Sequence, residues 1–592
     1  MEKTWVSGAA ERLTGWADSF FSPKPGTRTD RLLLALYYLE FAAIFALLMW
    51  KCRYGFADAD ENFFLSVPYR FVRGDRMLVQ EWHLAQFGLF TLIPEMWLYL
   101  RIAGTTEGIF LAFRYLYTVM WCAGALFLYL RARKIHEYGA RCASLFLECY
   151  APFGIMAFSY NSLAILYLVN AAVFLLCAGR LRKVQFAVSG FFFAGAVLCC
   201  PYLALVYLIY TAVLAAARLR KKDPVITINQ TKASVCWIWF TLGACVLAVI
   251  FLTWLFSGAS VHEILEALPR VLSDAEHDNF SLADKTLEYF GRISGSNALF
   301  YPMLITVILA TVLSLRRRRA VWMALVCAAV TLYLRRFLQE YGYMNFMMFP
   351  VTFAGIYTAV VTKDSRIRCM ARLWLIPGLL YTYCLHFSSN QFFYAISSAA
   401  SVSSAAGMIM MWMYCDELRE KDRQEGSRRP LHLIAYAAVL ICFVFQMRYE
   451  IPIRYQSVYW EPGLMKYEEQ QYIDEGPEKG IIATVEKAER FGRIYGEVRG
   501  IDHRRLLVLS EQVWVYFVND NENASYSGWL WRVNSYSMER LTEYYALRPE
   551  KKPEVVFVEA ENREMLKYFD PEQYDTEELE SGDCLVFSRE AG

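Results

Sequence analysis

Residues 56–94 read FADADENFFLSVPYRFVRGDRMLVQEWHLAQFGLFTLIP and follow directly after the first long apolar segment of the chain. The polar residues that stand out in this stretch are Asp58, Asp60, Glu61, Gly74, Asp75, Glu81 and His83. Aromatic residues surround them, and a second apolar run follows. Acidic groups and a histidine between two apolar segments indicate a polar site at the surface of a bilayer.

The composition of the rest of the chain indicates a membrane protein with many spans. Of the 592 residues, 56% are hydrophobic and 20% are charged, and the net charge is +2. These values exclude a disordered chain and a strongly basic protein that binds nucleic acid. Of the 15 cysteines, only Cys584 lies outside the apolar three quarters of the chain, and no CxxC pair occurs. We therefore expect no disulfide and no metal site built from cysteine.

Apolar runs near the length that crosses a bilayer recur up to residue 447 and predict about 13 transmembrane helices. A shorter run, residues 87–99, reads as interfacial or re-entrant. The predicted spans are residues 32–50, 108–130, 142–158, 163–178, 186–200, 201–218, 235–256, 299–315, 321–334, 344–361, 373–387, 392–414 and 431–447.

Positive charge at the span ends predicts the orientation. With the N-terminus in the cytoplasm, the basic clusters that begin at Arg131, Arg180, Arg218, Arg316 and Arg366, and the one at 419–429, all fall on the cytoplasmic side. The acidic loop and the C-terminal tail then lie outside. Arg335 and Arg336 are exceptions to this distribution of positive charge, because the number of predicted spans before them places them on the outer side. They either extend to the interface from a short helix end or hold a negatively charged group there.

The sequence predicts two domains: a transmembrane domain over residues 1–448, with a catalytic outer loop at 54–86, and a soluble extracytoplasmic domain over 449–592. In the second domain, short apolar stretches at 481–485, 505–509 and 553–558 alternate with helical patterns such as 538–547. This alternation indicates a small α/β structure.

The acidic cluster allows two kinds of chemistry. Asp58, Asp60 and Glu61 are close enough for one carboxylate to raise the pKa of another, so one of them can act as a general base. Asp58 and Asp60 can equally hold a divalent cation. Loop acids are also often merely solvated. We expect the largest cavity of the bundle to open outward and to be lined by Asp60, Glu61 and His83.

The order of one span, an outer loop with Asp60-Glu61, the Gly74-Asp75 turn and His83 before a Pro-containing apolar run resembles the GT-C superfamily of membrane glycosyltransferases. The nearest likeness is to the branch of protein O-mannosyltransferases and lipid A aminoarabinose transferases. The His-Pro-Pro typical of that branch is replaced here by His83-Leu84-Ala85. The resemblance implies Asp60 and Glu61, with Asp58, as catalytic residues, and Glu81 and His83, with Asp75, as substrate-binding residues.

The resemblance also implies the reaction. A carboxylate orients or deprotonates an acceptor, which is a glycan, a lipid or a protein. The acceptor attacks the sugar of a polyprenyl-phosphate donor at the outer face of the membrane, and the configuration inverts. No cofactor is certain, and a divalent cation is compatible with the acidic cluster.

Further candidates for substrate contact each have a structural alternative. Arg114, inside a predicted span, either contacts the donor phosphate or forms an ion pair with Glu40 or Glu148. Arg335 and Arg336 are candidates for the same phosphate. Tyr160, Asn161 and Asn390 lie in outer turns, where they either bond sugar hydroxyls or serve as turn formers.

Two other functions compete with glycosyl transfer: a transporter or flippase for lipid-linked glycans, and a polymerase or ligase of surface polysaccharide. Transporters commonly show internal repeats with broken helices and polar residues at mid-membrane. Here no repeat is evident and the polar residues gather at the predicted outer surface, which favours the transferase.

Overall fold

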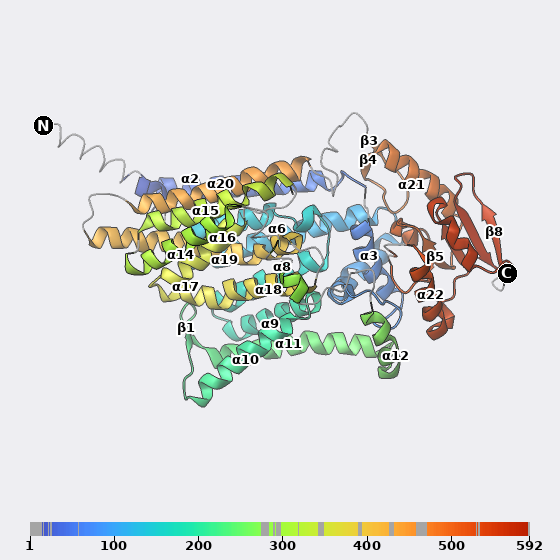
Figure 1. Cartoon of the computed structure of the whole chain (residues 1–592), viewed down its shortest axis with the longest axis horizontal. Helices are drawn as coiled ribbons and strands as arrows, with labels where there is room; N and C mark the ends of the chain where they lie inside the picture. Colours follow the sequence, from blue (N-terminus) through green and yellow to red (C-terminus); the bar gives the residue numbers. More distant parts are fainter. Residues whose placement is uncertain are drawn as a thin grey trace.

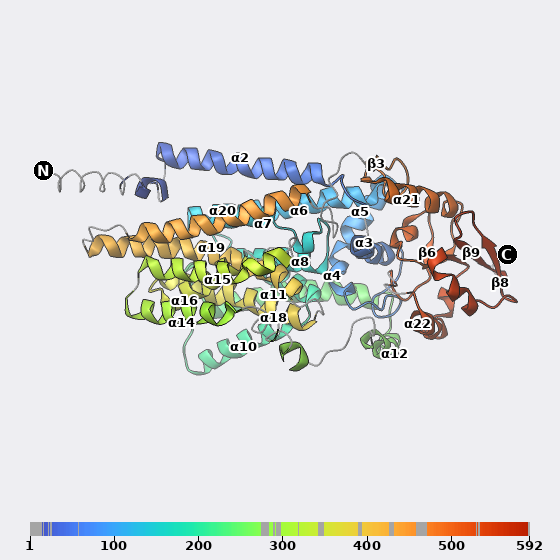
Figure 2. The ribbon, with the colours of Figure 1, turned by 45° about the horizontal axis from the view of Figure 1, so that its top comes forward.

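The computed structural model describes residues 15, 17–21, 23, 26–56, 59–273, 283–287, 291, 298–317, 319–340, 348–388, 393–425, 431–456, 470–528, 530 and 533–589; the side chains of 59, 153, 335–340, 388, 393–398, 449 and 453–456 are not described. Long helices run roughly along one axis and form a bundle, and the strands of residues 470–589 lie at one end of it (Figures 1 and 2). Following the predicted orientation, we call this the outer end.

The bundle contains most of the predicted spans as helices. They are α2 (Arg28–Lys51), α6 (Ile109–Ala132), α7 (Glu137–Cys149), α8 (Tyr160–Leu176), α9 (Arg182–Cys199), α10 (Leu203–Leu219), α11 (Ala233–Phe256), α14 (Phe300–Arg316), α15 (Ala320–Glu340), α16 (Met348–Val361), α17 (Ser365–Met370), the π-helical turn η3 (Ala371–Leu375), α18 (Ile376–Ser388), α19 (Phe393–Gln424) and α20 (His432–Gln456). Central packing pairs are α8 with α9, α9 with α11, and α19 with α16, α18 and α7.

Several of these helices are suited to a bilayer. Five are long and apolar enough to cross it: α2, α6, α9, α11 and the part of α20 up to Pro452. Five more apolar helices, α8, α10, α14, α15 up to Leu334 and α16, are shorter. Side chains such as Leu205, Leu208 and Ile209 on α10 remain exposed, as expected of a face that meets lipid. The chain is a multi-pass membrane protein, and the number of thirteen spans stays a prediction.

The third predicted span, residues 142–158, differs from the structure. Helix α7 starts earlier, with His136 as its N-cap, and ends at Cys149. A short 3-10 turn, η2 (Pro152–Gly154), follows, because Pro152 has no amide hydrogen to continue the helix. Helix α8 then begins after its N-cap residue Ser159, whose side chain accepts a hydrogen bond from the amide of Ser162 in a capping box.

The loop between the first two long helices is itself helical. It comprises α3 (Ala59–Val72), α4 (Gln86–Leu89), the 3-10 turn η1 (Phe90–Leu92) and α5 (Ile93–Ala103). Asp60 and Glu61 lie in the first turn of α3, where acidic groups favour the positive end of the helix dipole. With eleven residues, α5 is shorter than a span, in keeping with the interfacial prediction.

Residues 470–589 form a mixed sheet flanked by helices α21 (Val485–Val498) and α22 (Ser535–Leu547). Its five strands lie in the order β6 (Glu522–Asn523), β5 (Arg505–Leu509), β7 (Val555–Val558), β9 (Cys584–Ser588), β8 (Tyr574–Glu578). Strand β5 runs parallel to β6 and β7, whereas β9 is antiparallel to β7 and β8. Two further two-stranded sheets pair β3 (Gln470–Tyr472) with β4 (Ile482–Thr484), and β1 (Val225–Ile226) with β2 (Thr231–Lys232).

Both faces of this sheet are buried. Leu506 and Val508 of β5 join the hydrophobic cluster that contains Phe491 of α21, and Leu507 and Leu509 join the cluster that contains Leu541 of α22. This alternation explains why β5 reads in the sequence as a continuous apolar run.

The loop holds the outer sheet on the bundle. Trp82 is fully buried in the second cluster, and its backbone amide donates to the carbonyl of Tyr526 at 2.7 Å. The backbone amide of Ile482 donates to the carbonyl of Arg53 at 2.7 Å, and the amide of Gly55 donates to the carbonyl of Ile482 at 2.8 Å. Helix α12 (Val261–Leu272) adds an ion pair between Glu263 and Arg548 at 2.9 Å.

Candidate active site

Asp60 and Glu61 share the first turn of α3 but point to different partners. Neighbouring positions on an α-helix differ by about 100° around its axis, so the two carboxylates cannot face the same way. Glu61 is fully buried and points to α6, whereas Asp60 is half-buried and lies toward the start of α8.

Glu61 is clamped by Arg114. The Arg114 Nε and Nη2 donate to the two carboxylate oxygens of Glu61 at 2.7 and 2.6 Å, and Nη1 donates to the carbonyls of Cys52 and Gly55 at 3.1 and 2.8 Å. The Arg114 side chain is only 2% exposed. The ion pair predicted for Arg114 with Glu40 or Glu148 is therefore wrong in its partner, which is Glu61. This clamp fixes the end of α2 and the start of α3 on α6.

Asp60 lies beside a group of polar side chains at the outer end of the bundle. Its charge acts on the hydroxyl of Tyr160, and the ring of Phe64, one turn along α3, meets the ring of Tyr160 edge-on at 5.8 Å. Tyr381 of α18 lies close enough to interact electrostatically with Tyr160. The ring contact of Phe64 with Tyr160 joins α3 to the start of α8, and the electrostatic interaction of Tyr381 with Tyr160 links α18 to the same place.

Two members of this group are buried without a hydrogen-bond partner among the described residues: the side-chain oxygen of Asn161 and the hydroxyl of Tyr381. Asn161 is 3% exposed and Tyr381 is fully buried. A buried polar atom in a native protein usually has a partner, in the protein or in a bound molecule. Asn161 adjoins Tyr160 in the chain and Tyr381 interacts with it electrostatically, so unsatisfied polar atoms near this tyrosine suit a polar ligand.

His83 packs on the other side of α3. Its ring centroid lies 4.4 Å from that of Phe63, and its Nδ1 accepts from the amide of Ala85 at 3.0 Å. An accepting Nδ1 assigns the proton of the neutral ring to Nε2. The backbone amide of His83 donates to Glu81 at 3.0 Å, so the loop residues 81–85 are held in a defined turn.

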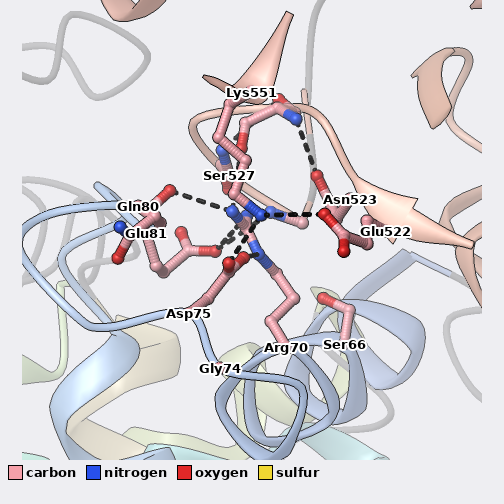
Figure 3. A network of polar contacts seen from close by, with 12 residues as sticks. Ser66, Arg70, Gly74, Asp75, Gln80, Glu81, Glu522, Asn523, Ser527 and Lys551 are labelled. Atoms are coloured by element: carbon pink, nitrogen blue, oxygen red, sulfur yellow. Dashed lines mark hydrogen bonds and ion pairs between the residues drawn. The ribbon is translucent and has the colours of Figure 1, made fainter. Parts of the chain in front are cut away.

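Asp75 and Glu81 converge on Arg70, deep between the loop and the outer sheet (Figure 3). Arg70 Nε donates to Asp75 and Nη1 to Glu81, both at 2.8 Å, and Nη2 donates to the carbonyls of Gln80 and Ser525, both at 2.9 Å. Four of the five hydrogens of the guanidinium head thus point to acceptors within the protein.

The outer sheet supplies the remaining contacts of this ion-pair network. Lys551 Nζ lies 2.7 Å from Asp75, and the amide of Gly528 donates to Glu81 at 3.2 Å. Burial alone would raise the pKa of Asp75, but Arg70 and Lys551 bring it below its ordinary value. Burial raises the pKa of Glu81, and Arg70 with two backbone amides opposes this rise. We assign Asp75 and Glu81 to the positioning of the outer domain, by which we mean residues 470–589 with the outer sheet.

Four other predicted site residues have side chains that the structure does not describe. Asp58 and Asn390 are outside the described residues, and Arg335 and Arg336 belong to α15 with side chains that are not described. Within the described ranges, no three His, Cys, Asp or Glu side chains gather as a metal site.

Three cavities stand out, and none of these three is lined by Asp60, Glu61 or His83. One of about 600 Å³ lies at the outer end between Tyr69, Glu107 and His503. The other two lie between the helices of the bundle, one beside Trp374 and one beside Arg372.

Three important residues escaped sequence reasoning. Arg70 is a cation in an aromatic stretch of α3, and this unusual setting is a signal that could have identified it. Lys551 and Tyr381 carry no such signal, because their roles depend on contacts hundreds of residues away.

No known protein family model matches the chain. No curated protein matches it either. Among solved structures, the chain is similar to the archaeal oligosaccharyltransferase AglB from Archaeoglobus fulgidus in complex with an inhibitory peptide and a dolichol-phosphate, with 11% identity and a TM-score of 0.44 over 94% of this chain and 74% of that one. The apo form of the Archaeoglobus fulgidus oligosaccharyltransferase gives 12% identity and a TM-score of 0.46 over 89% and 69%. At these values the likeness does not specify an activity.

Proposed function

We propose that the chain is a GT-C-type glycosyltransferase that moves a sugar from a polyprenyl-phosphate donor to an acceptor at the outer face of the membrane. The observation that carries the proposal is the half-buried Asp60 beside Tyr160, near Asn161 and Tyr381, whose buried polar atoms have no partner among the described residues. An acid and unsatisfied polar groups at the outer end of an apolar bundle suit a sugar carried by a membrane lipid.

In this proposal the Asp60 carboxylate accepts the proton of the acceptor nucleophile. The nucleophile forms its bond to the anomeric carbon while the bond from that carbon to the phosphate oxygen breaks. The electron pair leaves with the polyprenyl phosphate, and the single displacement inverts the configuration of the sugar. Tyr160, Asn161 and Tyr381 then bond sugar hydroxyls.

Glu61 acts through Arg114 in this scheme. The bidentate pair fixes the first turn of α3, and the fixed turn holds Asp60 toward α8. Arg114 donates hydrogen bonds to Glu61, Cys52 and Gly55, so we assign it to this positioning role. Arg335 and Arg336 remain our candidates for the leaving phosphate, since such a group needs positive charge.

The topology belongs to the same proposal. The N-terminus lies in the cytoplasm, and residues 449–592 lie outside the cell membrane as a domain of their own, attached through the loop at 54–86. Asp58 and Asn390 retain their proposed places beside the substrate. The acceptor is a glycan, a lipid or a protein.

The test is donor turnover by the full chain in liposomes. Polyprenyl-phosphate hexoses of different sugars are supplied in the bilayer, and released polyprenyl phosphate is measured with and without a mixture of glycan, lipid and peptide acceptors. We expect release to depend on the protein and on one donor sugar. Movement of intact donor between leaflets without any release would contradict the transferase and favour a flippase.

A further inference from the structure

The end of the bundle opposite the outer sheet contains a cavity of about 500 Å³ that is separate from the proposed active site. Its walls come from α10, the start of α11, the β1 hairpin and the α17–η3 segment. Apolar and aromatic side chains form most of its lining, among them Leu214, Trp237 and Leu373. Its two charged residues are Arg368 and Arg372.

The charges of the two arginines are only weakly compensated: Arg368 donates to the carbonyl of Lys363 at 3.3 Å and interacts electrostatically with Asp364, whose carboxylate is paired with Arg366. Arg368 and Arg372 are four positions apart across the start of the π-helical turn η3, so they lie on the same side of the segment, where like charges destabilise one another. Within the described part of the chain no carboxylate pairs with either of them, and no acid lines the cavity. The acid of the neighbouring connection, Asp223, is bound to Ser234 and Arg218. An anion between Arg368 and Arg372 would supply the missing charge.

An apolar cavity adjoins the first one inside the bundle. This second, narrower cavity of about 60 Å³ shares the wall residues Leu175, Tyr210, Trp237 and Leu373 with the first. Its lining is almost wholly apolar. The hydroxyl of Tyr210 donates to the carbonyl of Arg372 at the junction, which ties α10 to η3. A cationic mouth with an adjoining apolar cavity therefore matches the two ends of a lipid.

We propose that this cavity binds an anionic glycerophospholipid, with its phosphate between Arg368 and Arg372 and an acyl chain along Tyr210, Trp237 and Leu373. Basic pockets between transmembrane helices are suited to anionic headgroups, and the exposed guanidinium groups of Arg368 and Arg372 can reach such a headgroup at the membrane surface. The site is independent of the proposed glycosyl transfer.

The test measures lipid retention by the purified full chain in detergent, using native mass spectrometry. Phosphatidylglycerol and phosphatidylcholine with the same acyl chains are the probes, and glycerol phosphate without acyl chains is the third. We expect one phosphatidylglycerol to remain bound, phosphatidylcholine to be lost, and glycerol phosphate to bind too weakly to compete.

Two variants and a control separate the site from general attraction to basic surfaces. R368Q/R372Q should lower retention of phosphatidylglycerol by about fivefold for each arginine removed. A217W places a large side chain in the 500 Å³ cavity and should lower retention of phosphatidylglycerol. R316Q/R366Q removes the same charge from two other exposed arginines, which do not line the cavity, and should leave retention unchanged. Equal loss in R316Q/R366Q, unchanged retention in R368Q/R372Q, or full competition by glycerol phosphate would overturn the proposal.

Discussion

Replacing Arg70 by Gln should loosen the outer domain from the loop. Arg70 joins Asp75 and Glu81 to the carbonyl of Ser525 through bonds of 2.8–2.9 Å. In R70Q, Asp75 keeps Lys551, but the fully buried Glu81 keeps only two backbone amides. Removing one partner of a buried ion pair costs about 3–5 kcal/mol, because the other charge is left without compensation.

The assay is hydrogen–deuterium exchange of the full chain in detergent, read at the backbone amides of residues 505–509 in β5. A cost of about 3–5 kcal/mol corresponds to opening that is about a hundredfold or more frequent. R70Q/E81Q should recover part of the loss, because it removes the uncompensated charge. The control R73Q breaks only a partly exposed pair with Asp520, and should cost less than about 1 kcal/mol.

Exchange in R70Q that matches exchange in R73Q would refute the reasoning. It would mean that the Arg70 contacts do not hold the outer domain and that the hydrophobic contacts of Trp82 suffice. Failure of the double variant to recover any stability would show that the shape of the guanidinium, rather than its charge, carries the effect.

E61Q should destabilise the chain by about 3–5 kcal/mol in thermal melting, because Arg114 is left buried without a counter-charge; loss no greater than in E107Q, whose pair with Lys479 is exposed, would contradict this. G528A should also lower the melting temperature, since an added Cβ would lie 2.0 Å from Ser66 Oγ, whereas Gly500→Ala meets open space and should not. Asp75 should stabilise the fold above its unfolded pKa of about 4, and this stability should be lost as the pH falls through its lower folded pKa. The melting temperatures of wild type and D75N should therefore converge only in strong acid.

Sequence patterns predicted the helical elements well because each depends on its own residues. The apolar runs at 108–130 and 235–256 became α6 and α11 with shifts of at most two residues, and the run at 505–509 became β5 without a shift. The capping box at Ser159 and the proline at 152 set the ends that hydrophobicity alone missed.

Partners across the fold could not be predicted in this way. Positions 60 and 61 read alike in the sequence, yet the helical turn sends one to Tyr160 and the other to Arg114. The resemblance predicted Asp75 and Glu81 as substrate ligands, whereas their counter-charges are Arg70, which lies in the quoted stretch but played no part in the prediction, and Lys551, far along the chain. Only the packing of the outer sheet on the loop reveals these contacts.

The central claim is that the Asp60 carboxylate drives glycosyl transfer, and D60N tests it most directly. The variant keeps the shape of the side chain and removes the base. In liposomes with the donor that wild type uses, D60N should release polyprenyl phosphate about a hundredfold or more slowly, with donor affinity nearly unchanged. The control D570N changes an exposed aspartate of the outer domain and should retain full turnover. Turnover by D60N near that of D570N would contradict the account.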